Sequence, residues 1–203
     1  MKQVWRHISQ KLRGDNYYDH GNILLAEYKV IYFPIAKVAC SSIKKVFADL
    51  LCMKYDEQDI DDAVHELPYP YAKRQHLETE KYETFLKFAF VRNPWDRLYS
   101  CFKSKIMPDA SFKIRGFTKG VLDGFRRYGD SFYAGMSFRE FVVAVHAIPD
   151  NEADEHFRSQ YVAITDDDGN LLTNYIGRFE NLEEDFEYVR KWIGKDVALP
   201  KLQ

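Results

Sequence analysis

Two short apolar runs, each followed by a loop and an amphipathic stretch, dominate the first half of the chain. Residues 27–33 (EYKVIYF) are rich in β-branched and aromatic side chains and stop at Pro34, which predicts a buried strand. Residues 85–91 (FLKFAFV) have the same character, and Pro94 follows where it suits the first turn of a helix. Because strand, loop and helix occur twice in that order with a crossover between them, the pattern predicts a parallel sheet in an α/β fold.

Helical spacing follows both loops. The first apolar stripe, at i, i+3, i+4, i+7 and i+8, comprises Ile43, Val46, Phe47, Leu50 and Leu51. The second comprises Trp95, Leu98, Tyr99, Phe102 and Ile106. Ser137 and Glu140 form a capping-box pattern that predicts a helix to about residue 148. A final stripe from Leu182 to Ile193 is stopped by Gly194.

The remaining segments are less regular. Residues 1–27 are expected to form an N-terminal arm with one short element. Residues 107–136 carry five of the ten glycines, which is typical of a surface excursion, here expected on the acceptor side. Residues 161–164 and 171–176 flank the turn sequence DDDGN, so a hairpin is expected there.

Composition narrows the class of protein. With 203 residues, 46% of them hydrophobic, the chain is expected to form a single domain over 1–203. A net charge of -2 provides no overall basic field, so no nucleic-acid partner is expected. Three cysteines without a CxxC predict no zinc site and no disulfide framework. No apolar run is long enough to span a bilayer, which favours a soluble, cytoplasmic chain.

The loop after the first strand has the composition of an anion site. Lys37, Ser41 and Ser42 lie between the strand and the start of a helix, where backbone N–H groups attract phosphate or sulfate. The alternative is that a serine only caps the helix and Lys37 is solvated. No glycine occurs between Gly21 and Gly116, so a Walker A loop and a P-loop NTPase are not expected.

The loop after the second strand offers a guanidinium at the matching place. Arg92 ends the strand, and Ser100 lies about two turns into the next helix, so the two are candidates to bind one anion. The alternative is that Arg92 pairs with Asp96 or a carbonyl. Arg97 is expected in a helix-surface ion pair.

These residues carry a family resemblance. KVACSSIKK after an apolar strand and FVRNPWDRLYS after the next resemble the two signatures of carbohydrate sulfotransferases of the chondroitin type (sulfotransferase family 2), especially its soluble bacterial members. DEHFRSQ (154–160) and YIGRFENLEEDF (175–186) extend the resemblance over about residues 28–194. It implies a central parallel sheet with helices on both faces, a P-loop-NTPase-like fold without a Walker A sequence.

The resemblance also implies a chemistry. The donor is PAPS (3'-phosphoadenosine 5'-phosphosulfate), the product is PAP, the acceptor is a carbohydrate hydroxyl, and no metal is required. Lys37, Ser41 and Ser42 become contacts of the 5'-phosphosulfate, with Lys44 a weaker candidate. Arg92 and Ser100 become contacts of the 3'-phosphate.

The general base and the acceptor site are assigned more loosely. A histidine is the natural base near neutral pH. His65 is preferred because family members place a histidine at about that distance before the signature arginine, and His76 is the second candidate. His156 and Arg158, in DEHFRSQ, are acceptor-binding candidates with structural roles as alternatives. Six basic residues with interleaved aromatics between 105 and 130 suit an anionic polysaccharide, or a solvated lid.

Departures from the family pattern keep two other functions open. Ala36 stands where the family usually has proline before the signature lysine, and the C-terminal part of the family domain is expected to be missing after Leu199. A non-catalytic nucleotide-binding member of the fold is therefore one alternative. An ATP-dependent phosphotransferase is another, although it would need a glycine-rich loop and magnesium-binding carboxylates.

Overall fold

The computed structural model describes residues 21–111 and 114–202, and these fall into two compact units. The first unit contains the described residues of 1–92 and 160–203, and the second contains those of 93–159. The single domain over residues 1–203 that we infer from the sequence remains a prediction. Most of the expected N-terminal arm lies outside the described residues.

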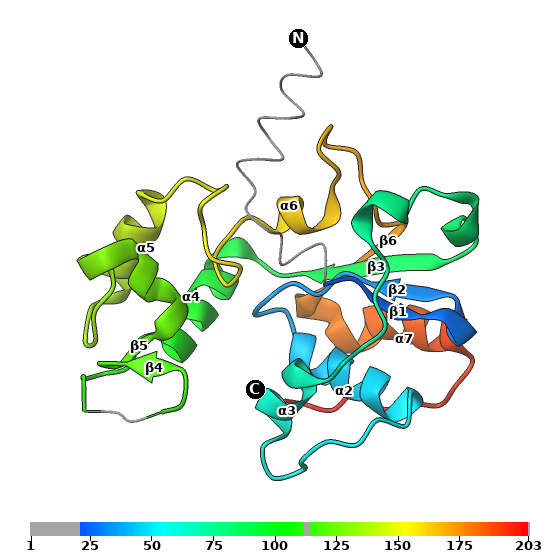
Figure 1. Cartoon of the computed structure of the whole chain (residues 1–203), viewed down its shortest axis with the longest axis horizontal. Coiled ribbons are helices and arrows are strands. Elements are labelled where there is room, and N and C mark those ends of the chain that lie inside the picture. Colours follow the sequence, from blue (N-terminus) through cyan, green and yellow to red (C-terminus); the bar gives the residue numbers. More distant parts are fainter. Residues whose placement is uncertain (1–20, 112–113, 203) are drawn as a thin grey trace. The chain divides into compact units, whose positions relative to one another are not determined.

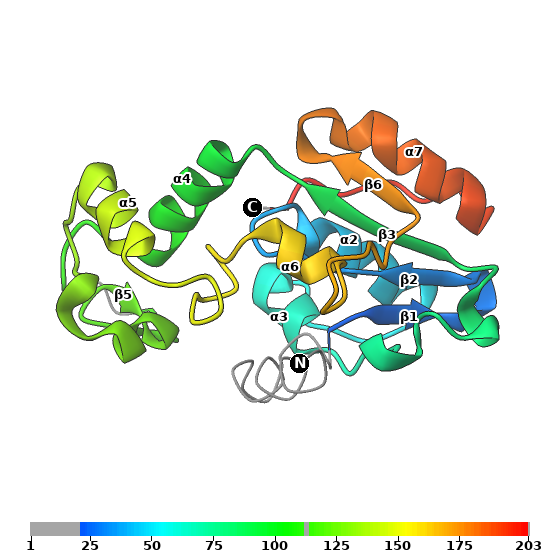
Figure 2. The same cartoon turned by 90° about the horizontal axis from the view of Figure 1, so that it is seen from above.

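A four-stranded sheet forms the centre of the first unit (Figure 2). The strands lie in the order β1 (Ile23–Leu25), β2 (Val30–Tyr32), β3 (Leu86–Val91) and β6 (Tyr175–Arg178). β2, β3 and β6 run parallel, while β1 pairs antiparallel with β2. The mostly parallel sheet predicted from the two apolar runs is confirmed, and β1 is an edge strand that the pattern did not predict.

Helices lie on both faces of this sheet (Figure 1). α2 (Cys40–Leu50) and α7 (Leu182–Ile193) cover one face, and α6 (Gln160–Ile164) lies on the other. α3 (Ile60–Glu66) packs beside α2. The mixed α/β class is confirmed, whereas the P-loop-like relationship stays a prediction.

Aromatic side chains fill the core between α2 and the sheet. The ring of Phe47 on α2 meets Tyr32 edge-on at 5.6 Å and Phe88 at 6.2 Å between centroids. All three residues are fully buried. Burying large aromatic rings is a major source of stability, so this cluster fixes the helix on which Ser41 and Ser42 lie.

The hairpin predicted around the DDDGN turn is wrong, although the turn itself is present. Asp166 Oδ1 accepts hydrogen bonds from the backbone N–H groups of Asp168 and Asn170, but pairing continues only through one bridge between Thr165 and Leu171. The residues before the turn form the one-turn helix α6 instead. The Arg74 guanidinium donates to the carbonyls of residues 162 and 163 at its end, satisfying groups that a helix leaves open.

The second unit has an aromatic core of its own. Its elements are α4 (Pro94–Lys105), β4 (Phe117–Thr118), β5 (Val121–Leu122), the 3-10 segment η5 (Asp123–Ser131) and α5 (Phe138–His146). Phe125 and Phe132 are buried there, with rings 5.0 Å apart. The segment 107–136, expected as a surface excursion, therefore contributes to the core of this unit.

The helix ends follow the predicted chemistry. Ser137 and Glu140 form the capping box of α5, and the hydrogen bonds from Ser137 and then Tyr133 lower the pKa of Glu140 to about 2. Asn93 caps α4 by accepting from Trp95 N at 3.0 Å, with Pro94 in the first turn. Gly194 ends α7 at φ 68°. The predicted capping box at Ser137, Pro94 in the first turn of α4 and the stop at Gly194 are confirmed. No serine caps α2, whose N-cap is Ala39.

Gly177 on β6 is expected to tolerate no side chain. A Cβ there would lie 2.4 Å from Cε1 of Phe90, whose side chain is buried. Gly177→Ala should lower the free energy of unfolding by about 1–3 kcal/mol through overpacking. Thermal unfolding would register a fall of roughly 2–4 °C per kcal/mol.

Gly124→Ala is the control for this substitution. A Cβ at Gly124 would meet only the Asp154 carboxylate at 3.4 Å, an ordinary contact distance. Its melting temperature should stay near that of the natural chain. If both variants have the same melting temperature, β6 is not tightly packed against Phe90.

Candidate functional site

The loop between β2 and α2 reaches an unusual backbone conformation without glycine. Lys37 (φ 67°) and Ala39 (φ 53°) both lie in the left-handed region. Such residues store strain of order 1–3 kcal/mol and cluster at functional sites. Ala39 is the N-cap of α2 and offers no side-chain cap, so backbone N–H groups of the first turn remain available to an anion.

Arg92 meets this loop directly. Its Nη1 donates a hydrogen bond to the carbonyl oxygen of Lys37 at 3.3 Å. The guanidinium lies over the ring of Phe179, 4.2 Å from the centroid, and Nε is buried without a hydrogen-bond partner among the described residues. The two signature loops therefore lie together at one edge of the sheet, as the sequence predicts.

The backbone of Arg92 is held by a residue that sequence reasoning missed. Gln160 accepts from Arg92 N at 2.9 Å and donates to Arg92 O at 2.8 Å. Phe179 was missed as well. Both lie in the further similar stretches 154–160 and 175–186, but no local pattern indicates that they contact an arginine 68 or more positions earlier.

His65 on α3 contacts the first turns of α2. Its Nε2 lies 3.0 Å from Oγ of Ser41 and 3.9 Å from Sγ of Cys40. Its Nδ1 lies 3.0 Å from Nζ of Lys44, a residue only 7% exposed. The structure thus brings the preferred histidine to the predicted anion loop.

His76, the second candidate base, has different surroundings. It lies in the 3-10 helix η3 (Arg74–His76) and is exposed. Its Nε2 is 3.3 Å from the side-chain amide nitrogen of Gln75, and its carbonyl accepts from Thr79. These contacts join it to its own segment and not to α2.

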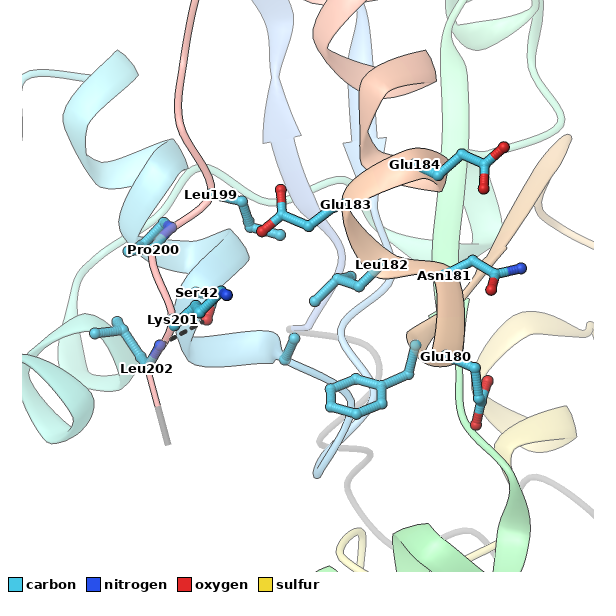
Figure 3. Close-up of a pocket in the computed structure, with 12 residues that line it drawn as sticks. Ser42, Glu180, Asn181, Leu182, Glu183, Glu184, Leu199, Pro200, Lys201 and Leu202 are labelled. Carbon is cyan, nitrogen blue, oxygen red and sulfur yellow. Dashed lines mark hydrogen bonds between the residues drawn. The ribbon is translucent and has the colours of Figure 1, made fainter.

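A cleft of about 550 Å³ opens beside the start of α2 (Figure 3). Ser42 lies on its wall and is buried, and its Oγ accepts a hydrogen bond from the backbone N–H of Leu202 at 3.2 Å. Leu182 and Glu183 extend toward the C-terminal segment, as Figure 3 shows. The lining residues are Ala39, Ser42, Phe179, Glu180, Asn181, Leu182, Glu183, Glu184, Leu199, Pro200, Lys201 and Leu202.

Ser100 lies in the second unit, half-buried on α4. One turn earlier, Arg97 is 5% exposed and donates to the carbonyl oxygens of Arg158 and Glu155, each at 2.8 Å. The expectation that Arg97 lies on the helix surface is wrong. A buried guanidinium has five donors to satisfy, and these loop carbonyls accept from two of them.

His156 and Arg158 are also held inside the second unit. His156 Nδ1 lies 2.6 Å from Asp154 Oδ1, and Arg127 donates to the other carboxylate oxygen at 3.1 Å. Burial would raise the pKa of Asp154, but the hydrogen bond and charge of His156 lower it below its ordinary value. Arg158 Nε donates to the carbonyl of Ala153 at 2.9 Å. The structure brings the two acceptor-side candidates into one hydrogen-bonded loop.

Metal and membrane features were searched over the same residues. Within 21–111 and 114–202, no three His, Cys, Asp or Glu side chains are grouped so that they could bind a metal ion. None of the helices in those ranges has the length and apolar character needed to cross a bilayer.

Comparison with known proteins identifies carbohydrate sulfotransferases as relatives of this chain. Human carbohydrate sulfotransferase 9 is 26% identical over 196 residues, covering 87% of this chain and 42% of its own length. Rat carbohydrate sulfotransferase 11 is 25% identical over 190 residues (83% and 51%), and mouse carbohydrate sulfotransferase 8 is 26% identical over 182 residues (82% and 42%).

The chain spans about half the length of these curated relatives. No solved structure gives a significant match. A profile of the Sulfotransferase family matches residues 22–200, which include both signature loops. The chain therefore belongs to the Sulfotransferase family.

Proposed function

We propose that this chain transfers a sulfuryl group from PAPS to a hydroxyl of a carbohydrate. The observation that carries the proposal is the hydrogen bond from Arg92 to the carbonyl of Lys37. It brings a guanidinium to the loop that carries a lysine and an open helix end, so one ligand with two separated anionic groups could be bound by both. The matched relatives are named carbohydrate sulfotransferases, which favours this acceptor class.

The 5'-phosphosulfate is assigned to the start of α2. Lys37 supplies a full positive charge there, and the first-turn N–H groups supply partial charge. Ser41 adds a hydroxyl that can donate. Ser42 can also donate, because its hydrogen bond to Leu202 uses its oxygen as the acceptor.

The 3'-phosphate is assigned to Arg92, while the role of Ser100 stays a prediction from the family resemblance. A guanidinium that already stacks on Phe179 is oriented, so it loses little conformational freedom on binding an anion. The cleft suits the adenosine part of the donor. Leu182 and Leu199 offer apolar surface to a purine, and the nearby carboxylate of Glu183 would repel a phosphate.

The transfer itself is an in-line displacement. The acceptor oxygen attacks sulfur while its proton passes to His65, and the bond from sulfur to the bridging oxygen breaks with its electron pair moving to the departing phosphate. Lys37 and the N-terminus of α2 stabilise the negative charge that develops on that phosphate. No metal is needed in this scheme.

The second unit is assigned to the acceptor. His156 and Arg158 would contact the sugar, and the basic and aromatic residues between 105 and 130 would favour an anionic polysaccharide. Lysine and arginine attract uronic acids or sulfate esters, whereas Phe125 is buried in the core of the second unit and offers no ring to a sugar. Phe112 of this segment lies outside the described residues.

A thermal-shift comparison tests the donor. PAP should raise the melting temperature at micromolar concentration, since a ligand at 100 times its Kd stabilises by about 2.7 kcal/mol. ATP with magnesium should have little effect, because it lacks the 3'-phosphate that Arg92 is proposed to bind. Arg92→Met should weaken the binding of PAP. The melting temperature of this variant without ligand should stay near that of the natural chain. Stabilisation by ATP in preference to PAP would overturn the donor assignment.

A further inference from the structure

Both ring nitrogens of His65 have partners, and the partners differ in what they can do. Lys44 Nζ lies 3.0 Å from Nδ1, and Ser41 Oγ lies 3.0 Å from Nε2. An ammonium group only donates, whereas a hydroxyl both donates and accepts. Nδ1 must therefore accept from Lys44, and the neutral ring carries its proton on Nε2, where it donates to Ser41.

The fold holds this arrangement in place. Ser41 and Lys44 are three residues apart on α2, so they present to the same side of the helix, toward α3. Lys44 is 7% exposed, and a charge removed from water to that degree needs a hydrogen-bond partner. The 3.0 Å contact with Nδ1 of His65 is one hydrogen bond available to this ammonium.

This tautomer is the wrong one for a base acting at Nε2. That nitrogen faces Ser41 and the anion loop, and its lone pair is already protonated. To accept a proton there, the ring must lose the Nε2 proton to water and gain one on Nδ1, with no net change in proton number. Lys44 blocks that exchange as long as its ammonium occupies Nδ1.

We infer that Lys44 is a positioning residue that keeps His65 protonated on Nε2 until an anion at the start of α2 draws the ammonium away. The inference rests on the proposed function, because the donor phosphosulfate is the anion expected there. Binding of the donor then exchanges the tautomer and makes the base available. His65 acts on the acceptor only in the donor-bound chain.

The tautomer can be read directly in the full chain labelled with ¹⁵N. Long-range ¹H–¹⁵N correlation spectra distinguish the two neutral imidazole forms, and the His65 signals are assigned by their loss in His65→Gln. Without ligand, the natural chain should show protonated Nε2. A ring protonated on Nδ1, or doubly protonated at neutral pH, would overturn the inference whatever the variants show.

Three variants separate positioning from simple packing. Lys44→Met keeps the aliphatic stem and should give a mixture of both His65 tautomers. Lys44→Arg keeps a positive donor and should show the Nε2-protonated form of the natural chain. Ser41→Ala should leave the tautomer unchanged, because Lys44 and not Ser41 sets it. A Lys44→Met spectrum identical to that of the natural chain would reduce Lys44 to a packing role.

Titration with PAP tests the second half of the inference. The His65 spectrum should shift toward the form protonated on Nδ1 as PAP saturates the chain. If PAP raises the melting temperature but the His65 spectrum stays the same, the coupling is wrong and the proposed function stands. If PAP neither stabilises the chain nor alters the spectrum, the donor assignment and the coupling both fail.

Discussion

His65→Ala is expected to lower kcat for sulfuryl transfer by about 10²–10⁴-fold, the usual contribution of a positioned general base. PAP should still bind, because the imidazole is assigned to the acceptor proton and not to a donor phosphate. Transfer of labelled sulfate to a panel of glycans of differing charge measures the first quantity, and titration calorimetry with PAP measures the second.

His76→Ala is the matched control for this variant. His76 is exposed and contacts Gln75 in its own segment, so its removal should leave kcat near that of the natural chain. The reverse pattern, with an active His65→Ala and an inactive His76→Ala, would move the base to His76. Two fully active variants would place it on another residue altogether.

Lys37→Ala should reduce kcat by about 10²–10³-fold, comparable to the loss of one preorganised group that stabilises developing negative charge. Lys37 has a φ of 67°, and alanine bears the same left-handed strain as lysine, so the change is expected to remove mainly the charge. Lys45→Ala is the control, since Lys45 lies on α2, beyond the loop that carries Lys37, and forms an i,i+4 salt bridge with Asp49 that should be dispensable.

Lys37→Gly adds a second measurement at the same position. Glycine relieves a left-handed conformation that costs other residues about 1–2 kcal/mol, so this variant should melt higher than Lys37→Ala and be just as inactive. Unchanged transfer in both variants would remove Lys37 from the mechanism.

A natural chain that binds PAP tightly yet transfers no sulfate would favour the non-catalytic alternative.

The sheet and the helices on it could be predicted because their signals are local. Residues 85–91 show β-branched and aromatic runs that stop at turn residues, and β3 spans Leu86–Val91. The capping box at Ser137 is equally local, since its partner lies three residues away. By contrast, a short apolar run such as residues 161–164 cannot be assigned to strand or helix by pattern alone. It was predicted as a strand and forms α6, whose carbonyls at 162 and 163 accept from Arg74.

The candidate site could be predicted only where a motif carried it. Lys37 and Arg92 follow strands of one parallel sheet, so their meeting was expected from topology. His65 came from the family resemblance, since nothing in the sequence itself indicates a contact with Ser41 across 24 positions. Gln160, Phe179 and the segment ending at Leu202 were missed because packing, and not pattern, brings them to the cleft.

The left-handed conformations of Lys37 and Ala39 have a consequence for how loops of this kind are recognised in other sequences. Searches for phosphate loops usually rely on glycine, because glycine adopts this backbone region at little cost. Here a lysine and an alanine adopt it, and the surrounding fold bears the strain. Any screen of genomes that demands glycine at these places would pass over proteins built in this way.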